Sequence, residues 1–519
     1  MKRENMIAQI ERHKGEWDFI VIGGGATGVG TAIEAASRGY KVLLMEQSDF
    51  GKGTSSRSTK LVHGGVRYLQ QGNLSLVLEA LKERGLLRKN APHLVHDLPF
   101  IVPNYDWWEG PFYGIGLKLY DMLAGKEGFG SSKLLSKEET IKHIPTVEPD
   151  GLSGGVIYYD GQFDDARLII NMAETAYEQG AVLVNYMKVD SLIKSNSVVC
   201  GVTATDLEAS KTYELRAKAV INATGVFSDS VRKMDDVNST NIVVGSQGTH
   251  IVLDRSFLPG DSAIMVPHTD DGRVLFAIPW HDTILVGTTD NEVDDYLLEP
   301  IPMEDEIEFL LTHTARYLTK DPKRSDILSV FSGLRPLVKS GDAENTAAIS
   351  RDHTILISRS GLVTICGGKW TTYRKMAEDV IDHAAHLAQL NEKPSVTARL
   401  QIHGCHNHAA EFGDLEIYGS DAIAIKELYR ENKSYKDILH PKFKTTHGEV
   451  VWAVRNEMAR TVDDFLSRRT RNLLLDAKAS VEAAPSVAKI MAKELGKNRK
   501  WMKNQIEEFN RIANNYIVE

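Results

Sequence analysis

The hydrophobic positions near the start of the chain predict a strand, a tight turn, a helix and a second strand. Residues 18–22 form a short run rich in β-branched side chains, and a glycine-rich segment follows at 23–28. Small and apolar residues then recur at helical spacing over 29–38, and 41–46 again has the apolar character of a strand. A strand–helix–strand unit of about 30 residues is typical of the opening of a doubly wound α/β domain.

Later segments predict a second sheet and a separate helical region. Runs of β-branched residues indicate a sheet that is largely antiparallel, and helical periodicity dominates from about residue 400 onwards. The predicted elements are a helix at 166–177, strands at 181–186, 217–222, 241–253, 274–278, 283–287 and 363–366, a helix at 370–388, and helical stretches at 450–475 and 486–513.

Composition and charge narrow the class of protein. Of 519 residues, 42% are hydrophobic and 25% are charged, which is close to the average for globular chains and argues against disorder. The net charge of −9 gives no global indication of nucleic-acid binding. Three widely spaced cysteines cannot form a disulfide framework, so a reducing, cytosolic setting is expected. The first residues lack the apolar core of a secretory signal, and no charge-free apolar run reaches the ~18 residues of a membrane span, which leaves peripheral attachment open.

The glycine-rich segment has the spacing of a dinucleotide-binding fingerprint. Gly23, Gly25 and Gly28 fit G-x-G-x-x-G, which permits a tight turn, close approach of a pyrophosphate, and close packing of helix on strand. Glu46 ends the second strand, where a carboxylate accepts hydrogen bonds from a ribose and disfavours NADP. The alternative is a glycine-rich turn with a salt-bridging Glu46. FAD and NAD both use this fold. The hydroxyl-rich segment 48–60 suits either contact with a long, deeply inserted cofactor or an ordinary polar loop.

Further blocks of sequence carry a resemblance to one enzyme family. They lie at 54–56, 60–69, 222–225, 287–290, 332–336, 350–353 and 367–374. The most telling pair is Gly-Gly-Val-Arg-Tyr at 64–68 and Gly-Gly-Lys-Trp-Thr-Thr-Tyr-Arg at 367–374. Together with 23–46, these blocks resemble the FAD-dependent glycerol-3-phosphate dehydrogenases over nearly the whole chain.

The resemblance implies a fold of the α/β class with three parts. These are a doubly wound FAD-binding domain of the D-amino-acid-oxidase and glutathione-reductase type, a substrate-binding domain with an antiparallel sheet, and a helical C-terminal cap domain. The corresponding boundaries are 15–95, 151–235 and 345–395 for the FAD-binding domain, 96–150 and 236–344 for the substrate-binding domain, and 396–519 for the cap domain.

The resemblance also implies an activity. It is the oxidation of sn-glycerol 3-phosphate to dihydroxyacetone phosphate, with hydride transfer to FAD and transfer of the electrons to a membrane quinone. The protein is then expected to be peripheral on the cytoplasmic, inner face of the cell membrane. A homodimer is left open, and no nucleic-acid partner is expected. An oxidase that reduces oxygen to hydrogen peroxide and a non-catalytic nucleotide-binding sensor are the alternatives. The mitochondrial relatives carry EF-hand loops, and the tail of this chain has no such motif, so a calcium-regulated form is not expected.

A substrate with a phosphate dianion and a secondary alcohol needs cations and a base. Guanidinium groups hold phosphate in two parallel hydrogen bonds, and a histidine of near-neutral pKa can accept a hydroxyl proton. The resemblance implies His250 as the general base, with mere orientation of the hydroxyl as its alternative role, and Arg335 as the group that stabilises the developing alkoxide. The implied substrate-binding residues are Arg67, Tyr68, Thr288, Arg351 and Lys369. The implied FAD-binding residues are Gly23, Gly25, Gly28, Glu46, Thr54, Ser55, Ser56, Val189, Ala223, Gly225, Gly368, Trp370 and Thr371.

Four other signals have ordinary structural interpretations. The histidines and cysteine of 403–408 lack the paired spacing of a zinc site, so we expect a solvated loop and no metal. Cys366 is expected to be a small buried strand residue. The aromatic residues and lysines of 99–126 suit either a membrane interface or an interior packing face. The arginines between 455 and 471 are expected on a solvated helix face with salt bridges, with a lipid or a partner subunit as alternatives.

Overall fold

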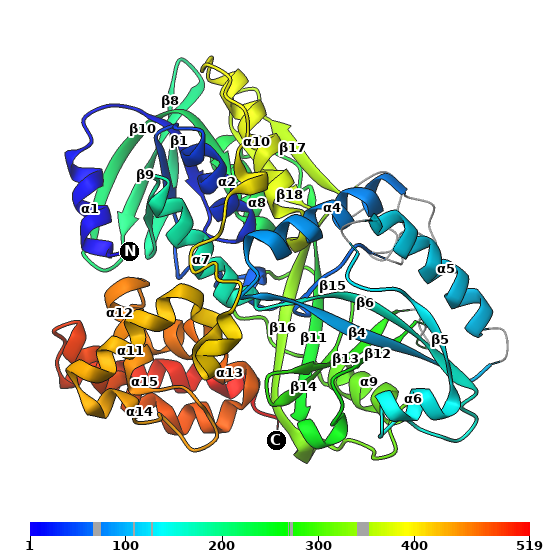
Figure 1. Ribbon diagram of the computed structural model, residues 1–519. Coiled ribbons are helices and arrows are strands. Elements are labelled where there is room, and N and C mark those ends of the chain that lie inside the picture. The colour runs from blue at the N-terminus through cyan, green and yellow to red at the C-terminus, as the bar shows by residue number, and fades with distance from the viewer. Residues whose placement is uncertain are drawn as a thin grey trace.

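Two β-sheets and a group of C-terminal helices form the three main parts of the protein (Figure 1). In this computed structural model, the first sheet lies at the top of the view, the second at the lower right, and the C-terminal helices at the lower left. The structure describes residues 1–65, 74–106, 109–125, 128–267, 269, 273–339 and 352–518. The α/β fold predicted from the sequence is confirmed; the domain boundaries stay a prediction.

The first sheet contains the predicted strand–helix–strand unit. Its strand order is β17 (His353–Ile357), β18 (Val363–Gly367), β10 (Lys211–Asn222), β1 (Trp17–Ile22), β2 (Val42–Met45) and β7 (Val182–Val184), with β9 (Val198–Asp206) and β8 (Met187–Ser195) added through β10. The strands from β18 to β7 are parallel, and β17 is antiparallel to β18. In register, Ile22 pairs with Met45 and Asn222. The loops that follow these strands therefore start at one common edge, where open α/β sheets bind their ligands.

Helices cover both faces of this sheet. They are α2 (Ala26–Ser37), α7 (Asp165–Glu178), α8 (Ser228–Asp235) and α10 (Tyr373–Leu387), and α1 (Arg3–Arg12) packs beside β7. Every residue of β2 is buried, as expected for a parallel strand that is covered on both sides. A Cβ at Gly30 would lie 2.8 Å from the ring of Tyr373, so the absence of a side chain there permits the close packing of α2 against α10.

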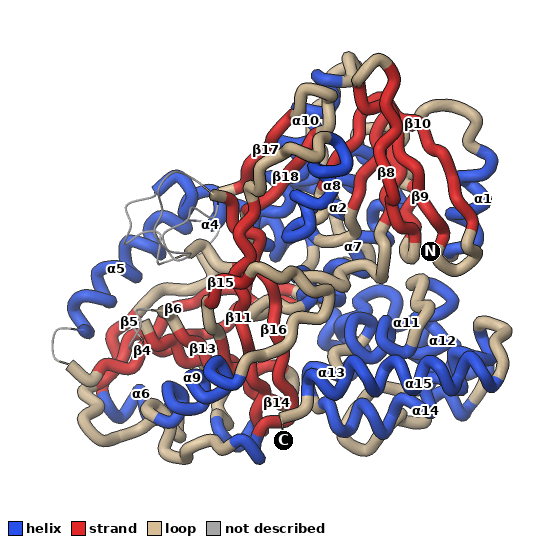
Figure 2. Tube along the Cα trace, turned by 180° about the vertical axis from the view of Figure 1, so that it is seen from behind, coloured by secondary structure: helices blue, strands red, loops and turns tan. Residues whose placement is uncertain are grey.

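The second sheet is mostly antiparallel, as predicted. Its strand order is β15 (Asn291–Val293), β11 (Val243–Asp254), β14 (Thr283–Gly287), β13 (Leu275–Trp280), β12 (Ala263–Val266), β4 (Val95–Asn104), β6 (Gly154–Phe163) and β3 (Leu61–Val62), with β16 (Ile327–Val338) beside β11 and β5 (Lys133–Ser136) beside β6. Its further helices are α4 (Leu74–Asn90), α5 (Glu109–Ala124), α6 (Lys137–His143) and α9 (Glu304–Ala315). Seen from behind, β11 and β16 run up to β18 of the first sheet (Figure 2), so the second sheet meets the first close to the edge where the nucleotide loops start.

The C-terminal region is helical, as predicted. Its α-helices are α11 (Ala422–Glu431), α12 (His447–Asn456), α13 (Asn472–Leu475), α14 (Ala477–Glu494) and α15 (Arg499–Ala513). The stretch 450–475 is broken just after α12, where Met458 has a φ of +53°, and 486–513 is broken at Gly496, with a φ of +64°. Left-handed residues end a helix, so each of the two predicted helical stretches is divided into separate helices. None of the described helices has both the length and the apolar character that crossing a membrane requires.

Candidate active site

The turn after β1 has the geometry that the glycine fingerprint predicts. Gly23 has a φ of +110°, and a Cβ at this position would lie 2.7 Å from the carbonyl oxygen of Ala223. A Cβ at Gly28 would lie 1.9 Å from the carbonyl oxygen of Gly23, so any side chain there would push the turn away from α2. Gly25 is the N-cap of α2 and has no side-chain cap. The turn thus leaves a helix N-terminus open to a phosphate group.

Glu46 and Ser55 are both bonded to this turn. The Gly24 amide donates to Glu46 Oε2 at 2.6 Å, the Ser48 amide donates to Oε1 at 2.8 Å, and the Ala26 amide donates to Ser55 Oγ at 2.9 Å. Burial raises the pKa of Glu46, and the two amide hydrogen bonds oppose this rise. The carboxylate therefore lies at the end of β2, next to the glycine turn, where the fingerprint requires the ribose-binding group.

Segments that are far apart in sequence meet beyond the turn. The indole N–H of Trp370 donates to the carbonyl oxygen of Ser55 at 2.9 Å, and its ring lies edge-on to Phe163 at 5.2 Å. The hydroxyl of Thr54 donates to the carbonyl oxygen of Leu334 on β16. The loop 54–56, the loop after β18 and the end of β16 are therefore neighbours.

The remaining predicted cofactor residues lie in three places. Ala223 and Gly225 follow β10 at the common edge; Gly225 has a φ of +58°, and a Cβ there would meet open space. Val189 lies on β8, a short way beyond Met187, whose amide donates to the carbonyl oxygen of Glu46 at 2.8 Å. Ser56, Gly368 and Thr371 belong to the two loops described above.

His250 is a buried, neutral imidazole on β11. Only 2% of it is exposed, its ring stacks on Phe331 at 5.0 Å, and its Nε2 lies 2.9 Å from Thr59 Oγ1. Within the described part of the chain, its Nδ1 has no hydrogen-bond partner. Burial, followed by the positive charges of Arg335 and Lys60, lowers the pKa of His250 well below its usual value. The ring is therefore a free base at neutral pH.

Arg335 lies on β16 opposite Ser246 of β11. Its guanidinium donates to Ser246 Oγ at 3.2 Å and to Thr288 Oγ1 at 3.0 Å, and lies 3.5 Å from Asp290. A Cβ at Gly248 would lie 2.2 Å from Nη2, so the guanidinium fills the space over this glycine. The structure thus brings His250, Arg335 and Thr288 into one region of the second sheet.

Sequence reasoning missed a buried ion pair in this region. Lys60 Nζ lies 2.8 Å from both oxygens of Asp165, and neither side chain is exposed. Burial lowers the pKa of Lys60 and raises that of Asp165, and the attraction between the two charges opposes both shifts. The ammonium also lies over the rings of Trp280 (5.2 Å) and Phe331 (5.4 Å). Lys60 stands inside a recognised block of sequence, but no sequence signal points to its partner 105 residues away.

Lys369 precedes the short helix 370–372, directly after Gly367 and Gly368, which have φ values of +78° and +76°. These left-handed conformations favour glycine and agree with the predicted close approach of this loop to a ligand. The predicted residues Arg67, Tyr68 and Arg351 lie outside the described residues.

The arginines between 455 and 471 and the histidines of 403–408 were both expected to be solvated, and the structure differs in part from this expectation. Arg468 makes the expected salt bridges with Asp463 (2.8 Å) and Asp464 (2.9 Å), but Arg468 and Arg469 are buried rather than on a solvated face, and both also bind Asp49 in the loop after β2. Although burial opposes it, Arg469 and Arg468 hold the pKa of Asp49 below its usual value. The ring of His403 is bonded to carboxylates rather than solvated. Cys366 is buried in β18 as predicted, and burial raises the pKa of its thiol to about 11.

Comparison with known proteins agrees with this arrangement. The family described as FAD dependent oxidoreductase matches residues 18–374, and the C-terminal domain of alpha-glycerophosphate oxidase matches residues 362–502. The mitochondrial glycerol-3-phosphate dehydrogenase of Mus musculus is 42% identical over 515 residues, which cover 92% of this chain and 71% of the mouse protein. The enzyme of Schizosaccharomyces pombe is 35% identical, with 99% and 89% covered. The chain belongs to the FAD-dependent glycerol-3-phosphate dehydrogenase family.

Solved structures agree with this family membership. The glycerol-3-phosphate dehydrogenase of Bacillus halodurans, complexed with FAD, has a TM-score of 0.81 and 29% identity over 99% of this chain and 97% of that chain. The L-alpha-glycerophosphate oxidase of Mycoplasma pneumoniae has a TM-score of 0.57 at 18% identity over 74% of this chain and 98% of that chain, which shows a shared fold. FAD is the cofactor of this family, and the glycine cradle at 23–28 with Glu46 at its edge fits it.

Proposed function

We propose that the protein oxidises sn-glycerol 3-phosphate to dihydroxyacetone phosphate and passes the electrons to a membrane quinone. The observation that carries the proposal is the pairing of a buried, uncharged imidazole with a guanidinium at the junction of the two sheets. His250 and Arg335 lie on adjacent strands, and the loop with Trp370 lies against the phosphate-binding turn through Ser55. This arrangement suits removal of a proton from an alcohol next to a bound flavin.

The chemistry divides between cofactor and protein. FAD, when bound, supplies the hydride acceptor. In the tautomer in which Nε2 of His250 donates its proton to Thr59 Oγ1, Nδ1 is the unprotonated nitrogen and accepts the hydroxyl proton of the substrate. Arg335 stabilises the negative charge that develops on the same oxygen, because its N–H groups are held in place by Ser246 and Thr288 before the substrate arrives.

The phosphate end of the substrate needs a separate set of cations. Arg67, Arg351 and Lys369 are proposed to hold the dianion, and Tyr68 to close over it. Thr288 is proposed as a polar contact to the substrate, since its hydroxyl already accepts a hydrogen bond from Arg335. The support for these roles is the match of the surrounding blocks of sequence to the family pattern.

Anaerobic titration of the FAD-loaded protein with glycerol 3-phosphate tests the reaction. We expect loss of the yellow flavin absorbance at stoichiometric substrate, and its fast return on addition of a soluble quinone analogue. Stoichiometric hydrogen peroxide without quinone would show an oxidase instead. A flavin that glycerol 3-phosphate does not bleach would refute the proposed activity.

We also propose that the outward face of α5 contacts the membrane. Tyr113 and Tyr120 of this helix are buried, which fits the interior-packing alternative for these two aromatic residues. Three apolar side chains on the helix and one on β5 nevertheless point to solvent. They are Ile115 (73% exposed), Leu119 (38%), Met122 (72%) and Leu134 (63%). A helix at the edge of the molecule with an exposed apolar stripe suits the membrane interface.

A vesicle-binding assay tests this surface. Ile115→Glu and Met122→Glu are expected to reduce sedimentation with vesicles that contain anionic phospholipid, because each places a charge where an apolar side chain would be buried. Ile423→Glu is the matched control, since Ile423 is 56% exposed on α11 in the C-terminal helices. Equal losses in all three variants would refute a specific role for α5.

A further inference from the structure

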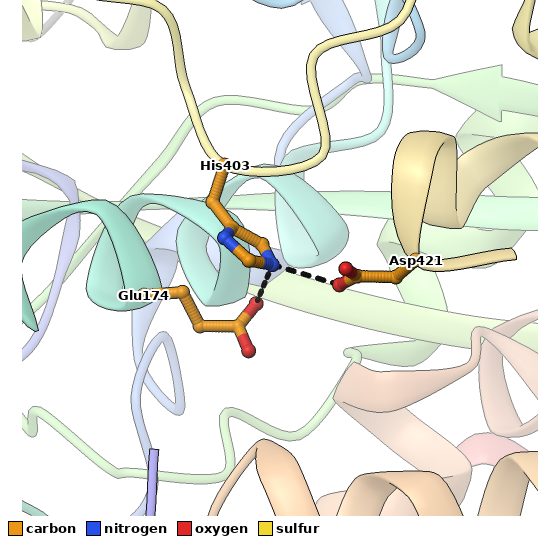
Figure 3. Close-up of side chains that lie close together, drawn as sticks. All are labelled: Glu174, His403 and Asp421. Carbon is orange, nitrogen blue, oxygen red and sulfur yellow. Dashed lines mark hydrogen bonds and ion pairs between the residues drawn. The ribbon is translucent and has the colours of Figure 1, made fainter. Parts of the chain in front are cut away.

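Three potential metal ligands from separate parts of the chain converge where α7 meets the C-terminal region (Figure 3). Glu174 lies on α7, His403 lies in the segment that leads into the C-terminal helices, and Asp421 ends the irregular helix Ala409–Asp421. Nε2 of His403 is 2.8 Å from Asp421 Oδ2 and 3.6 Å from Glu174 Oε2. All three ligand atoms lie within 4.8 Å of one another.

The backbone holds the imidazole in this position. The amide of His403 donates to Thr175 Oγ1, and its carbonyl oxygen accepts from Asn171 Nδ2, both at 2.8 Å. Next to it, the Ser420 amide donates to the carbonyl oxygen of Gly404 at 3.1 Å, which brings the end of the irregular helix against the histidine loop. His403 is thus fixed to α7 on one side and Asp421 is fixed to His403 on the other, so the arrangement is built by the fold.

A buried carboxylate oxygen in the cluster remains unsatisfied. Glu174 is 4% exposed, and within the described part of the chain its Oε2 makes no hydrogen bond. The nearest cationic atoms are His403 Nε2 at 3.6 Å and a nitrogen of Arg167 at 3.8 Å, and that nitrogen already donates to Glu457 at 2.6 Å. A protonated His403 offers one N–H on this side, and Asp421 accepts it. Two carboxylates therefore share one donor, whereas a single divalent cation would satisfy both.

We propose that Glu174, His403 and Asp421 bind a divalent transition-metal ion, with Zn²⁺ as the expected occupant. Zinc bonds of about 2.0–2.2 Å place neighbouring tetrahedral ligands roughly 3.3–3.6 Å apart. The His403–Glu174 separation of 3.6 Å matches this range, and the 2.8 Å between His403 and Asp421 would have to lengthen when the ion replaces the hydrogen bond. A set of ligands with one imidazole and two carboxylates favours zinc over calcium and magnesium, because calcium and magnesium prefer oxygen ligands alone. The side chain of His403 is 20% exposed, which gives the ion a path from solvent and leaves a position for water.

A fourth residue completes the pattern. Nδ1 of His403 lies 2.6 Å from Glu178 Oε1, on the side of the ring away from the other carboxylates. Carboxylates in this place orient metal-bound histidines and increase their basicity. The ion would link α7, which packs on the first sheet, to the C-terminal helices. This role is separate from flavin chemistry and does not rest on the proposed function.

Metal titration of the intact, FAD-loaded protein tests the site. After removal of bound metal with EDTA and dialysis, calorimetric titration with ZnCl₂ is expected to show one ion per chain and an increase in melting temperature. His403→Ala and the isosteric Glu174→Gln should abolish this binding, and Glu178→Gln should weaken it by roughly 10- to 100-fold. His408→Ala is the matched control, because this neighbouring histidine is exposed, and it should bind zinc as the parent does.

Two results would overturn the proposal. One is an absence of zinc binding at micromolar concentration in the parent protein, which would leave a proton as the occupant of the cluster. The other is zinc binding that survives Glu174→Gln and is lost in His408→Ala, which would place the ion on the exposed histidine loop. Flavin reduction by glycerol 3-phosphate should be the same before and after EDTA treatment, so this test is independent of the catalytic proposal.

Discussion

Asp165→Asn removes one charge from a pair that is completely enclosed. At 2.8 Å and an effective dielectric constant of about 20, the attraction between Lys60 and Asp165 is about 6 kcal/mol, and the cost of burying both charges offsets part of it. Removing one partner leaves the other charge uncompensated, for which a loss of about 3–5 kcal/mol in the free energy of unfolding is expected. Urea unfolding of the FAD-loaded protein, followed by tryptophan fluorescence, measures this loss, since Trp280 lies 5.2 Å from the ammonium group.

Two further variants separate charge burial from a general loss of packing. The double variant Lys60→Met/Asp165→Asn removes both charges and should recover most of the lost stability. Lys211→Met is the exposed control: Lys211 lies 2.6 Å from Glu11, but both side chains are solvated, so stability should stay within experimental error. A double variant as unstable as the sum of the two single variants, or a loss below about 1 kcal/mol for Asp165→Asn, would refute the reasoning.

Three more predictions concern the flavin reaction. Because the pKa of His250 lies well below 6.5, the rate of flavin reduction should stay level as the pH falls through 6.5, and a rate that halves there would contradict a neutral base. Arg335→Ala should slow anaerobic flavin reduction at least about tenfold, since a hydrogen bond to a charged group contributes roughly 1.5–3 kcal/mol, and unchanged stopped-flow kinetics would remove it from the site. Gly28→Ala should lower the FAD content of the purified protein because of the 1.9 Å approach to Gly23, whereas Gly53→Ala, with nothing within 4 Å of its Cβ, should retain FAD; equal FAD contents would contradict the steric argument.

The features that could be predicted from the sequence are formed by residues that are close to one another in the chain. The unit from 18 to 46 combines a strand, a turn and a helix whose signals are contiguous, and its glycines have the expected constraints. His250 and Arg335 could be named only through the family resemblance. They come together because β11 and β16 pair over their whole length, and this long-range pairing has no local signature.

The errors have a common physical origin. The arginines between 455 and 471 were expected on a solvated helix face, but Arg468 and Arg469 are buried, and both bind Asp49 on a distant loop while Arg468 also binds two nearby aspartates. His403 was expected in a solvated loop because 403–408 lacks the paired spacing of a zinc site, but its ring contacts Glu174 on α7, far away in sequence, and Asp421, 18 residues further along the chain. Charge patterns identify ionised side chains, whereas burial depends on partners that only the fold supplies.

The bonds from Asp49 to Arg468 and Arg469 set an order of events during synthesis. The carboxylate leaves the ribosome 419 residues before the first of these arginines. At about 5–20 residues per second, this delay is on the order of 20–80 s. Throughout that interval, the nascent nucleotide-binding region carries the Asp49 carboxylate while Arg468 and Arg469 have not yet been translated. Asp49 lies in the same loop after β2 as Glu46, the predicted ribose-binding residue. The loop after β2 therefore reaches its final ion pairs only after the C-terminal region has been synthesised as far as Arg469.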